Sequence, residues 1–212
     1  MNRTMHPFDF PSDIVTLTGN QADYYSFVND TYFPICKDQR VLEIGPNVGW
    51  HSAYIAKQSP SYFEVVESDT RCIKTLNNIP TIDKVVHNDI LLELQANSKQ
   101  FDVCICLGVL YHLHSPLYLL ELIVNKCQPK FILLDNVTAP HPLVFESENV
   151  NQYGNYHTIN NWKTCQLNFV VPFFICNQSL HAMGYQLETA NKQTVAWFPK
   201  SNGWTALWKL KE

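Results

Sequence analysis

Short apolar runs alternate with longer amphipathic stretches along most of the chain, and Gly, Pro and Asn residues separate them. Short apolar runs with such boundaries are typical of buried strands, and the stretches between them are typical of helices. Because strands and helices alternate, we expect an α/β fold in which a parallel sheet carries helices on both faces. The pattern predicts strands at 41–45, 62–67, 82–87, 101–107 and 130–135, and helices at about 49–58, 70–78 and 91–97 and from Ser115-Pro116 onward.

The helix that begins after residue 114 has a well-specified start. Ser115 suits the N-cap position and Pro116 the first helical position. The apolar stripe expected to face the core consists of Leu117, Leu120, Val124 and Cys127.

The two ends of the chain depart from this alternation. Within residues 1–39, aromatic and apolar side chains at helical spacing predict a helix, which we interpret either as a packing element or as a lid. Near the other end, Gly184 ends a helix predicted at 174–183, and strands at 185–191 and 203–209 would close the sheet as a hairpin-like pair. The side chains at helical spacing near the N-terminus are Tyr24, Phe27, Val28 and Tyr32.

Residues 137–172 interrupt the alternation with prolines, aromatic residues and many amides, more than a simple connection needs. In open α/β sheets, substrate sites lie beyond the carboxyl ends of the strands. We therefore interpret this segment as an insertion over the substrate side of a single domain that spans residues 1–212.

The composition limits the classes of partner and the cysteine chemistry that we expect. The 212 residues are 46% hydrophobic and carry a net charge of -4, so neither nucleic acid nor an anionic membrane is favoured. The N-terminus lacks the apolar core of a signal peptide, and no run approaches the ~18 apolar residues of a membrane span, which predicts a cytoplasmic protein. Seven cysteines without a C-x-x-C pair indicate neither disulfides nor zinc, and Cys104 and Cys106 are expected to pack in the core.

The segment VLEIGPNVGW, residues 41–50, predicts a strand, a tight turn and the start of a helix. A dinucleotide fingerprint fails here, because Asn47 and Trp50 stand where its second and third glycines would be. Any tight strand-to-helix turn can use glycines, but the spacing E-x-G-x-N-x-G resembles motif I of the class I S-adenosylmethionine-dependent methyltransferases.

That resemblance implies a Rossmann-like sheet of seven strands in the order 3-2-1-4-5-7-6, with the last strand antiparallel. It implies S-adenosyl-L-methionine as the cofactor, held at its methionine end by the turn after the first strand. The residues that inherit this role are Glu43, Gly45, Pro46, Asn47 and Gly49.

Two further segments extend the resemblance in the same order. Glu67, with Ser68 beside it, closes the second strand where the family places an acid on the ribose hydroxyls. Asp69 is better explained as the N-cap of the next helix. After the third strand, Asn88, Asp89 and Ile90 match the adenine-binding positions, although a loop acid there is also common.

The stretch LGVLYH, from Leu107 to His112, resembles the group that includes the tRNA wobble-uridine carboxymethyltransferases. The resemblance implies that Leu107 borders the cofactor and that Tyr111 and His112 face the transferred methyl group. The same residues could instead be ordinary loop residues. The basic N-terminal region of that group is missing, which favours transfer of an ordinary methyl group.

Asp135 and Asn136 close the fifth strand, where catechol-type O-methyltransferases hold a divalent metal ion. The further metal-binding acid of those enzymes is replaced by Leu107-Gly108, so we expect no metal and interpret Asp135 as a general base or substrate ligand.

The sequence thus predicts a methyltransferase that modifies an O, N or S atom of a small polar acceptor, with His112, Tyr111 or Asp135 taking the proton. Two alternatives stay open: an RNA (tRNA) methyltransferase whose partner supplies a basic surface, and a cofactor-binding module without catalysis. The acceptor and the oligomeric state are not specified by the sequence.

Overall fold

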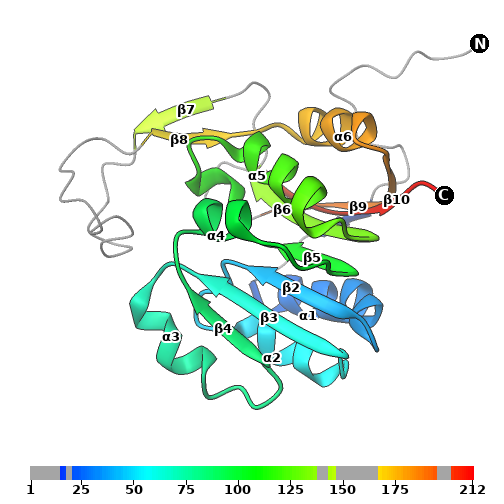
Figure 1. Ribbon diagram of the computed structural model, residues 1–212. Helices are drawn as coiled ribbons and strands as arrows, with labels where there is room; N and C mark the ends of the chain where they lie inside the picture. The colour runs from blue at the N-terminus through cyan, green and yellow to red at the C-terminus, as the bar shows by residue number, and fades with distance from the viewer. Residues whose placement is uncertain (1–14, 18–20, 138–142, 147–166, 195–201) are drawn as a thin grey trace, which may run out of the picture.

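The computed structural model describes residues 15–17, 21–137, 143–146, 167–194 and 202–212, and one mixed sheet forms its centre (Figure 1). The eight strands of this sheet lie in the order β1-β9-β10-β6-β5-β2-β3-β4. They span Val15–Leu17 (β1), Arg40–Ile44 (β2), Tyr62–Glu67 (β3), Lys84–His87 (β4), Val103–Cys106 (β5), Phe131–Val137 (β6), Tyr185–Thr194 (β9) and Asn202–Leu210 (β10).

The strand order confirms the predicted topology. Counted from β2, the seven strands that the sequence predicted follow the order 3-2-1-4-5-7-6. The five neighbouring strands β4, β3, β2, β5 and β6 are parallel to one another. β10 is antiparallel to both β6 and β9. β1 adds a short parallel edge beside β9, which the sequence analysis did not predict.

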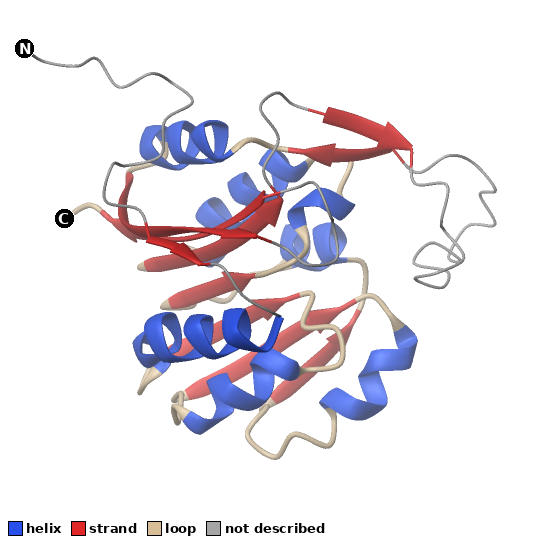
Figure 2. Cartoon of the chain, turned by 180° about the vertical axis from the view of Figure 1, so that it is seen from behind, coloured by secondary structure: helices blue, strands red, loops and turns tan. Residues whose placement is uncertain are grey.

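Helices cover both faces of the sheet, as Figures 1 and 2 show. One face carries α1, α2 and α3, and the other carries α4, α5 and α6, because the chain reverses its winding direction after β4. The helices span Gln21–Tyr32 (α1), Trp50–Lys57 (α2), Thr70–Leu76 (α3), Ile90–Ala96 (α4), Pro116–Leu122 (α5) and Phe173–Ala182 (α6), with shorter turns at Phe33–Cys36 (η1), Leu110–His112 (η2) and Ile123–Cys127 (η3).

Alternate residues of the strands build two hydrophobic cores. Val41 packs on the side of α1, α2 and α3, whereas Leu42 and Ile44 pack on the opposite side. Cys104 and Cys106 are completely buried in this second core, which confirms their predicted packing role. Cysteine thus fills the space between sheet and helices as a small apolar residue.

The start of α5 agrees with the sequence, and its buried face agrees except at Leu117, since Leu120 and Cys127 are buried and Val124 packs against the core. Ser115 occupies the N-cap position and Pro116 begins the helix, although the Ser115 hydroxyl makes no capping hydrogen bond. Leu117 was predicted to face the core and is 36% exposed, whereas Leu119 is completely buried. The buried residues Pro116, Leu119, Leu120 and Ile123 lie at helical spacing and place Leu117 at the edge of the buried face.

The predicted insertion contains a second, two-stranded sheet. β7, Leu143–Glu146, pairs antiparallel with β8, Leu167–Val170, while 138–142 and 147–166 lie outside the described residues. β8 lies against the short turn η2, which carries two predicted catalytic residues. None of the helices in the described segments has the length and apolar character needed to cross a membrane.

Candidate active site

The turn between β2 and α2 needs left-handed backbone angles at three positions. The φ angles are +67° at Gly45, +54° at Asn47 and +83° at Gly49. Glycine reaches such angles without steric cost, and asparagine reaches them more readily than most residues. Asn47 is therefore compatible with a position in the turn that needs a left-handed angle.

Glycine is also required at position 45 because three loops converge there. A Cβ atom at Gly45 would lie 2.4 Å from Val109 Cγ2 and 3.7 Å from Ile90 Cδ1. Ile90 begins α4 after β4, and Val109 follows β5, so the carboxyl ends of β2, β4 and β5 meet at this point. The sequence motifs predicted to surround one ligand thus lie at one edge of the sheet.

Glu67 links the same edge to the end of β3. Its carboxylate is buried and accepts two backbone N–H bonds, from Asn47 to Oε2 at 2.7 Å and from Asp69 to Oε1 at 2.8 Å. The Asn88 N–H donates to the Glu67 carbonyl oxygen at 3.2 Å. The two N–H bonds fix the aim of the carboxylate, and each oxygen keeps a second lone pair for a hydroxyl donor.

Glu43 lies deeper in the protein than Glu67. Its Oε2 accepts a hydrogen bond of 2.6 Å from the Ser52 hydroxyl on α2. Burial raises the pKa of Glu43 to about 8, the Ser52 hydrogen bond opposes this rise, and the nearby Glu67 charge adds to it. The protonated, neutral form therefore predominates at neutral pH, and this side chain ties the strand to α2.

The residues after β3 and β4 also cap helices. Asp69 accepts the Arg71 N–H at 2.9 Å and caps α3, as predicted. Asp89 Oδ1 accepts the Leu92 N–H at 3.0 Å and caps α4, which leaves Oδ2 for a further donor. Capping and ligand binding are compatible, because a carboxylate has several acceptor sites. Ser68 extends this edge, and its carbonyl oxygen lies 3.2 Å from His87 Nε2.

Asp135, at the end of β6, connects three parts of the chain. Its Oδ2 accepts the Tyr24 hydroxyl of α1 at 2.6 Å, and its Oδ1 accepts the N–H of Gly108 in the turn after β5. Tyr24 Oη also lies 3.1 Å from the Thr205 hydroxyl on β10. Burial raises the pKa of Asp135 to about 6, while the hydrogen bonds from Tyr24 and Gly108 oppose the rise.

Tyr111 and His112 follow the same turn. Their rings are 4.3 Å apart between centroids, and both side chains are half-buried. A Cβ atom at Gly108 would lie 3.4 Å from Tyr111 Oη. Gly108 therefore brings the three predicted catalytic residues into one neighbourhood. Leu107, just before it, is half-buried and packs against the core beneath α1.

Asn136 points to the opposite side from its neighbour Asp135 and donates to the Val171 carbonyl oxygen at 3.1 Å. Over the described segments, no group of three or more His, Cys, Asp and Glu side chains is arranged to hold a metal ion.

Sequence reasoning missed Tyr24 and Thr205 as members of this site. Tyr24 was predicted as one of several apolar positions of a helix, and it does pack against the core. Its hydroxyl meets a carboxylate 111 residues away along the chain, and no local pattern marks such a pairing.

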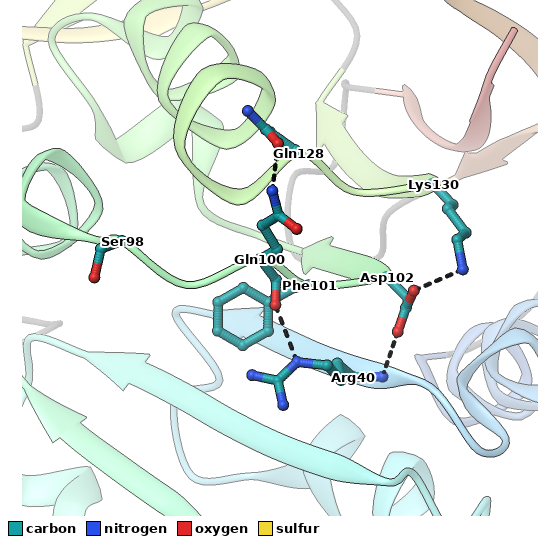
Figure 3. Close-up of a pocket in the computed structure, with 7 residues that line it drawn as sticks. All are labelled: Arg40, Ser98, Gln100, Phe101, Asp102, Gln128 and Lys130. Atoms are coloured by element: carbon teal, nitrogen blue, oxygen red, sulfur yellow. Dashed lines mark hydrogen bonds and ion pairs between the residues drawn. The ribbon is translucent and has the colours of Figure 1, made fainter.

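A surface pocket at the other end of the strands is separate from these residues (Figure 3). It lies at the amino ends of β2, β5 and β6, and Asp102 is the central hydrogen-bond and ion-pair partner in it. Asp102 accepts the Arg40 N–H at 3.0 Å and pairs with Lys130 at 2.8 Å. The pocket is lined by Arg40, Ser98, Gln100, Phe101, Asp102, Gln128 and Lys130.

Comparison with known proteins identifies the family and relates the fold to solved methyltransferases. A family model described as a methyltransferase domain matches residues 20–186. The magnesium protoporphyrin IX methyltransferase of Synechocystis PCC 6803, crystallised with bound SAH, is 10% identical, with a TM-score of 0.60 over 90% of this chain and 81% of that one. N-methyltransferase NodS from Bradyrhizobium japonicum WM9 is 12% identical, with a TM-score of 0.62 over 91% and 97%. An S-adenosylmethionine-dependent methyltransferase from Mesorhizobium loti is 10% identical, with a TM-score of 0.59 over 82% and 92%.

Proposed function

Because this chain belongs to the methyltransferase domain family and is an S-adenosylmethionine-dependent enzyme, we propose that it transfers a methyl group to an O, N or S atom of a small polar acceptor. The bound cofactor supplies an electrophilic methyl group on a sulfonium centre. The protein must then align the acceptor and remove its proton, the two contributions by which its own residues accelerate the transfer.

Glu67 is the proposed ribose ligand, and its geometry is the observation that carries the proposal. Two backbone N–H groups hold its carboxylate at the edge where β2, β4 and β5 end, and its remaining lone pairs suit two vicinal hydroxyls. Asp89 Oδ2 suits an amino group, and Ile90 beside it suits the face of a ring. The turn from Gly45 to Gly49 forms the rest of the proposed cofactor site.

The acceptor site is proposed to lie around Gly108. Asp135 is the favoured proton acceptor, because a carboxyl group with a pKa of about 6 is largely ionised at neutral pH and still binds a proton readily. Tyr111 and His112 stand next to the same turn and are proposed to position the acceptor. This arrangement favours an enzyme over the alternative of a module that binds the cofactor without catalysis.

The N-terminal residues 1–39 and the segment 137–172 are proposed to flank the acceptor within a single domain. α1 supplies Tyr24 to Asp135, and β8 lies against the turn that carries Tyr111 and His112. Both segments therefore contribute residues beside the proposed reaction centre.

The described lysines do not favour an RNA acceptor or the carboxymethyl chemistry of the wobble-uridine group. Lys57 and Lys74 lie on α2 and α3, on one face of the sheet, whereas Lys126 lies in η3 on the other face. A protein surface that binds the phosphate backbone of RNA needs its positively charged side chains close together. Lys192 lies on β9, and Lys163 and Lys200 lie outside the described residues.

Calorimetry with S-adenosylhomocysteine, followed by incubation of a metabolite extract with methyl-labelled cofactor, tests the proposal. We expect saturable binding and label in one or a few small products. Binding without label in any extract component would overturn the catalytic part, and label in tRNA alone would overturn the choice of acceptor.

A further inference from the structure

Helix α1 makes a contact in the proposed site that the family resemblance did not supply. The Tyr24 hydroxyl donates to Asp135 Oδ2 at 2.6 Å, and its oxygen can accept from the Thr205 hydroxyl, 3.1 Å away. Thr205 is buried on β10, the strand beside β6. The hydroxyls form a chain from Thr205 through Tyr24 to the carboxylate.

The helix that carries Tyr24 is held firmly in place. Val28 and Tyr32, on the inner face of this helix, are completely buried, and the Tyr32 hydroxyl donates to Asn191 on β9. Near the start of the helix, Tyr25 stacks on Trp50 of α2, with ring centroids 6.3 Å apart. These contacts fix the position of α1, and with it the backbone of Tyr24, over β9 and α2.

The carboxylate is constrained from both sides. Gly108 donates to Oδ1 and Tyr24 to Oδ2, so rotation of the carboxyl group would lose both bonds. Each oxygen keeps one lone pair, and a proton from an acceptor can bind there. Hydrogen bonds to the charged form stabilise the carboxylate in a buried place where it would otherwise take up a proton.

We propose that Tyr24 is a positioning residue for methyl transfer, whose hydroxyl keeps the Asp135 carboxylate ionised and aimed at the acceptor. This inference rests on the proposed function of Asp135. Among the described residues, the titratable side chains near Asp135 include Tyr24 on α1 and Cys106 on β5, and the turn η2, which contacts β6, adds Tyr111 and His112.

The first test measures the ionisation of Asp135 without using activity. In protein labelled with ¹³C at the aspartate carboxyl carbon, a signal that titrates near pH 6 should be missing from Asp135→Asn. In Tyr24→Phe the signal should titrate about one pH unit higher, because a hydrogen bond to the charged form is lost. An unchanged midpoint in a folded Tyr24→Phe protein would overturn the inference.

The second test measures turnover with labelled cofactor and the metabolite extract. Tyr24→Phe should lower the rate at pH 7 by about tenfold, of which about twofold comes from the smaller ionised fraction of Asp135 and the rest from the lost aim of its carboxylate. It should also move the acid limb of the pH profile upward, with little change in S-adenosylhomocysteine binding. Tyr118→Phe removes a hydroxyl from α5, on the opposite face of the sheet, and should change neither the rate at pH 7 nor the acid limb. Equal effects of the two variants would count against a role at Asp135.

If Tyr24→Phe fails to fold, Thr205→Val removes the outer link of the chain and should raise the same carboxyl midpoint by a smaller amount. A Thr205→Val protein with the wild-type midpoint would overturn the chain of hydroxyls. Failure of the wild-type protein to bind S-adenosylhomocysteine would instead overturn the proposed function, and the calorimetric result therefore separates the two failures.

Discussion

The Asn47 N–H donates to Glu67 Oε2 across 2.7 Å and so joins the turn after β2 to the end of β3. One carboxylate thus does two things: it stabilises a turn that has left-handed angles, and it presents its remaining lone pairs at the edge where the strands end. The proposed methionine and ribose contacts are therefore coupled before any ligand binds. A change at either residue should alter both.

Glu67→Ala should weaken S-adenosylhomocysteine binding by about 100-fold, because hydrogen bonds to a charged group contribute roughly 1.5–3 kcal/mol each. Glu67→Gln should have a smaller effect, since an amide keeps one acceptor oxygen but cannot accept both backbone N–H bonds. Isothermal titration calorimetry measures both variants.

Glu188→Gln is the matched control for these variants, because Glu188 is exposed on β9 and bonds to Gln186. The Glu188→Gln protein should bind S-adenosylhomocysteine with wild-type affinity. Wild-type affinity in Glu67→Ala, in a protein whose circular dichroism is unchanged, would show that Glu67 is not the ribose ligand.

Gly45→Ala should destabilise the protein by about 2–4 kcal/mol, because alanine is strained at a φ of +67° and its Cβ would overlap Val109. Gly184→Ala separates these two causes. Its φ is +94°, but the nearest side-chain atom would be 3.8 Å from the new Cβ, so it should cost only about 1–2 kcal/mol.

Urea denaturation of both glycine variants, of Val109→Ala and of the double variant Gly45→Ala/Val109→Ala provides the measurement. If overlap dominates, the double variant should be less destabilised than the sum of the two single changes. Strict additivity would attribute the whole cost to the backbone angle.

Most of the fold could be predicted because it depends on local periodicity. Strand 62–67 and the helix after Asp69 came directly from an apolar run, an acid and a cap, and each lies where it was expected. The left-handed angle at Asn47 likewise follows from the chemistry of one side chain. These features are encoded within a few residues of where they occur.

Features that depend on distant parts of the chain could not be predicted in this way. β1 has three residues, and its pairing with β9 depends on the available sheet edge rather than on its own pattern. The contact of Tyr24 with Asp135 depends on how α1 packs, and the exposure of Leu117 depends on which side of α5 the sheet covers. Sequence spacing identified the site residues but not the side chains that orient them.

Glu43 should make folding stability depend on pH. Its folded pKa of about 8 lies above the ordinary value of 4.5, so the folded state holds a proton that the unfolded state releases between these values. This contribution to stability is fully present below about pH 4.5 and is lost as the pH rises to about 8. Glu43→Gln, which is neutral throughout, should not lose it.

The free energy of unfolding in urea at pH 5, 6.5 and 8 measures this effect. Relative to the wild type, Glu43→Gln should become more stable at each step, by at least about 1 kcal/mol between the first and last pH. A difference between the two proteins that does not change with pH would show that Glu43 is already ionised in the fold.

Asp135→Asn should lower the rate of methyl transfer by about 100-fold while leaving S-adenosylhomocysteine binding nearly unchanged, because general-base catalysis contributes roughly 10²–10⁴ in rate. In the wild type, the pKa of about 6 predicts that the rate falls as the pH drops through 6, where the carboxylate takes up a proton. The variant should lack this acid limb.

Label transfer measured from pH 5 to pH 8 in both proteins decides the role of Asp135. A variant that keeps both the rate and the acid limb would move the proton acceptor to His112, the next group beside the Gly108 turn. A variant that keeps the acid limb but loses most of the rate would make Asp135 the residue that holds that turn through the Gly108 N–H, with no role in proton transfer. Only the joint loss of rate and limb identifies Asp135 as the base, because a residue that merely positions the loop does not set the pH at which activity fails.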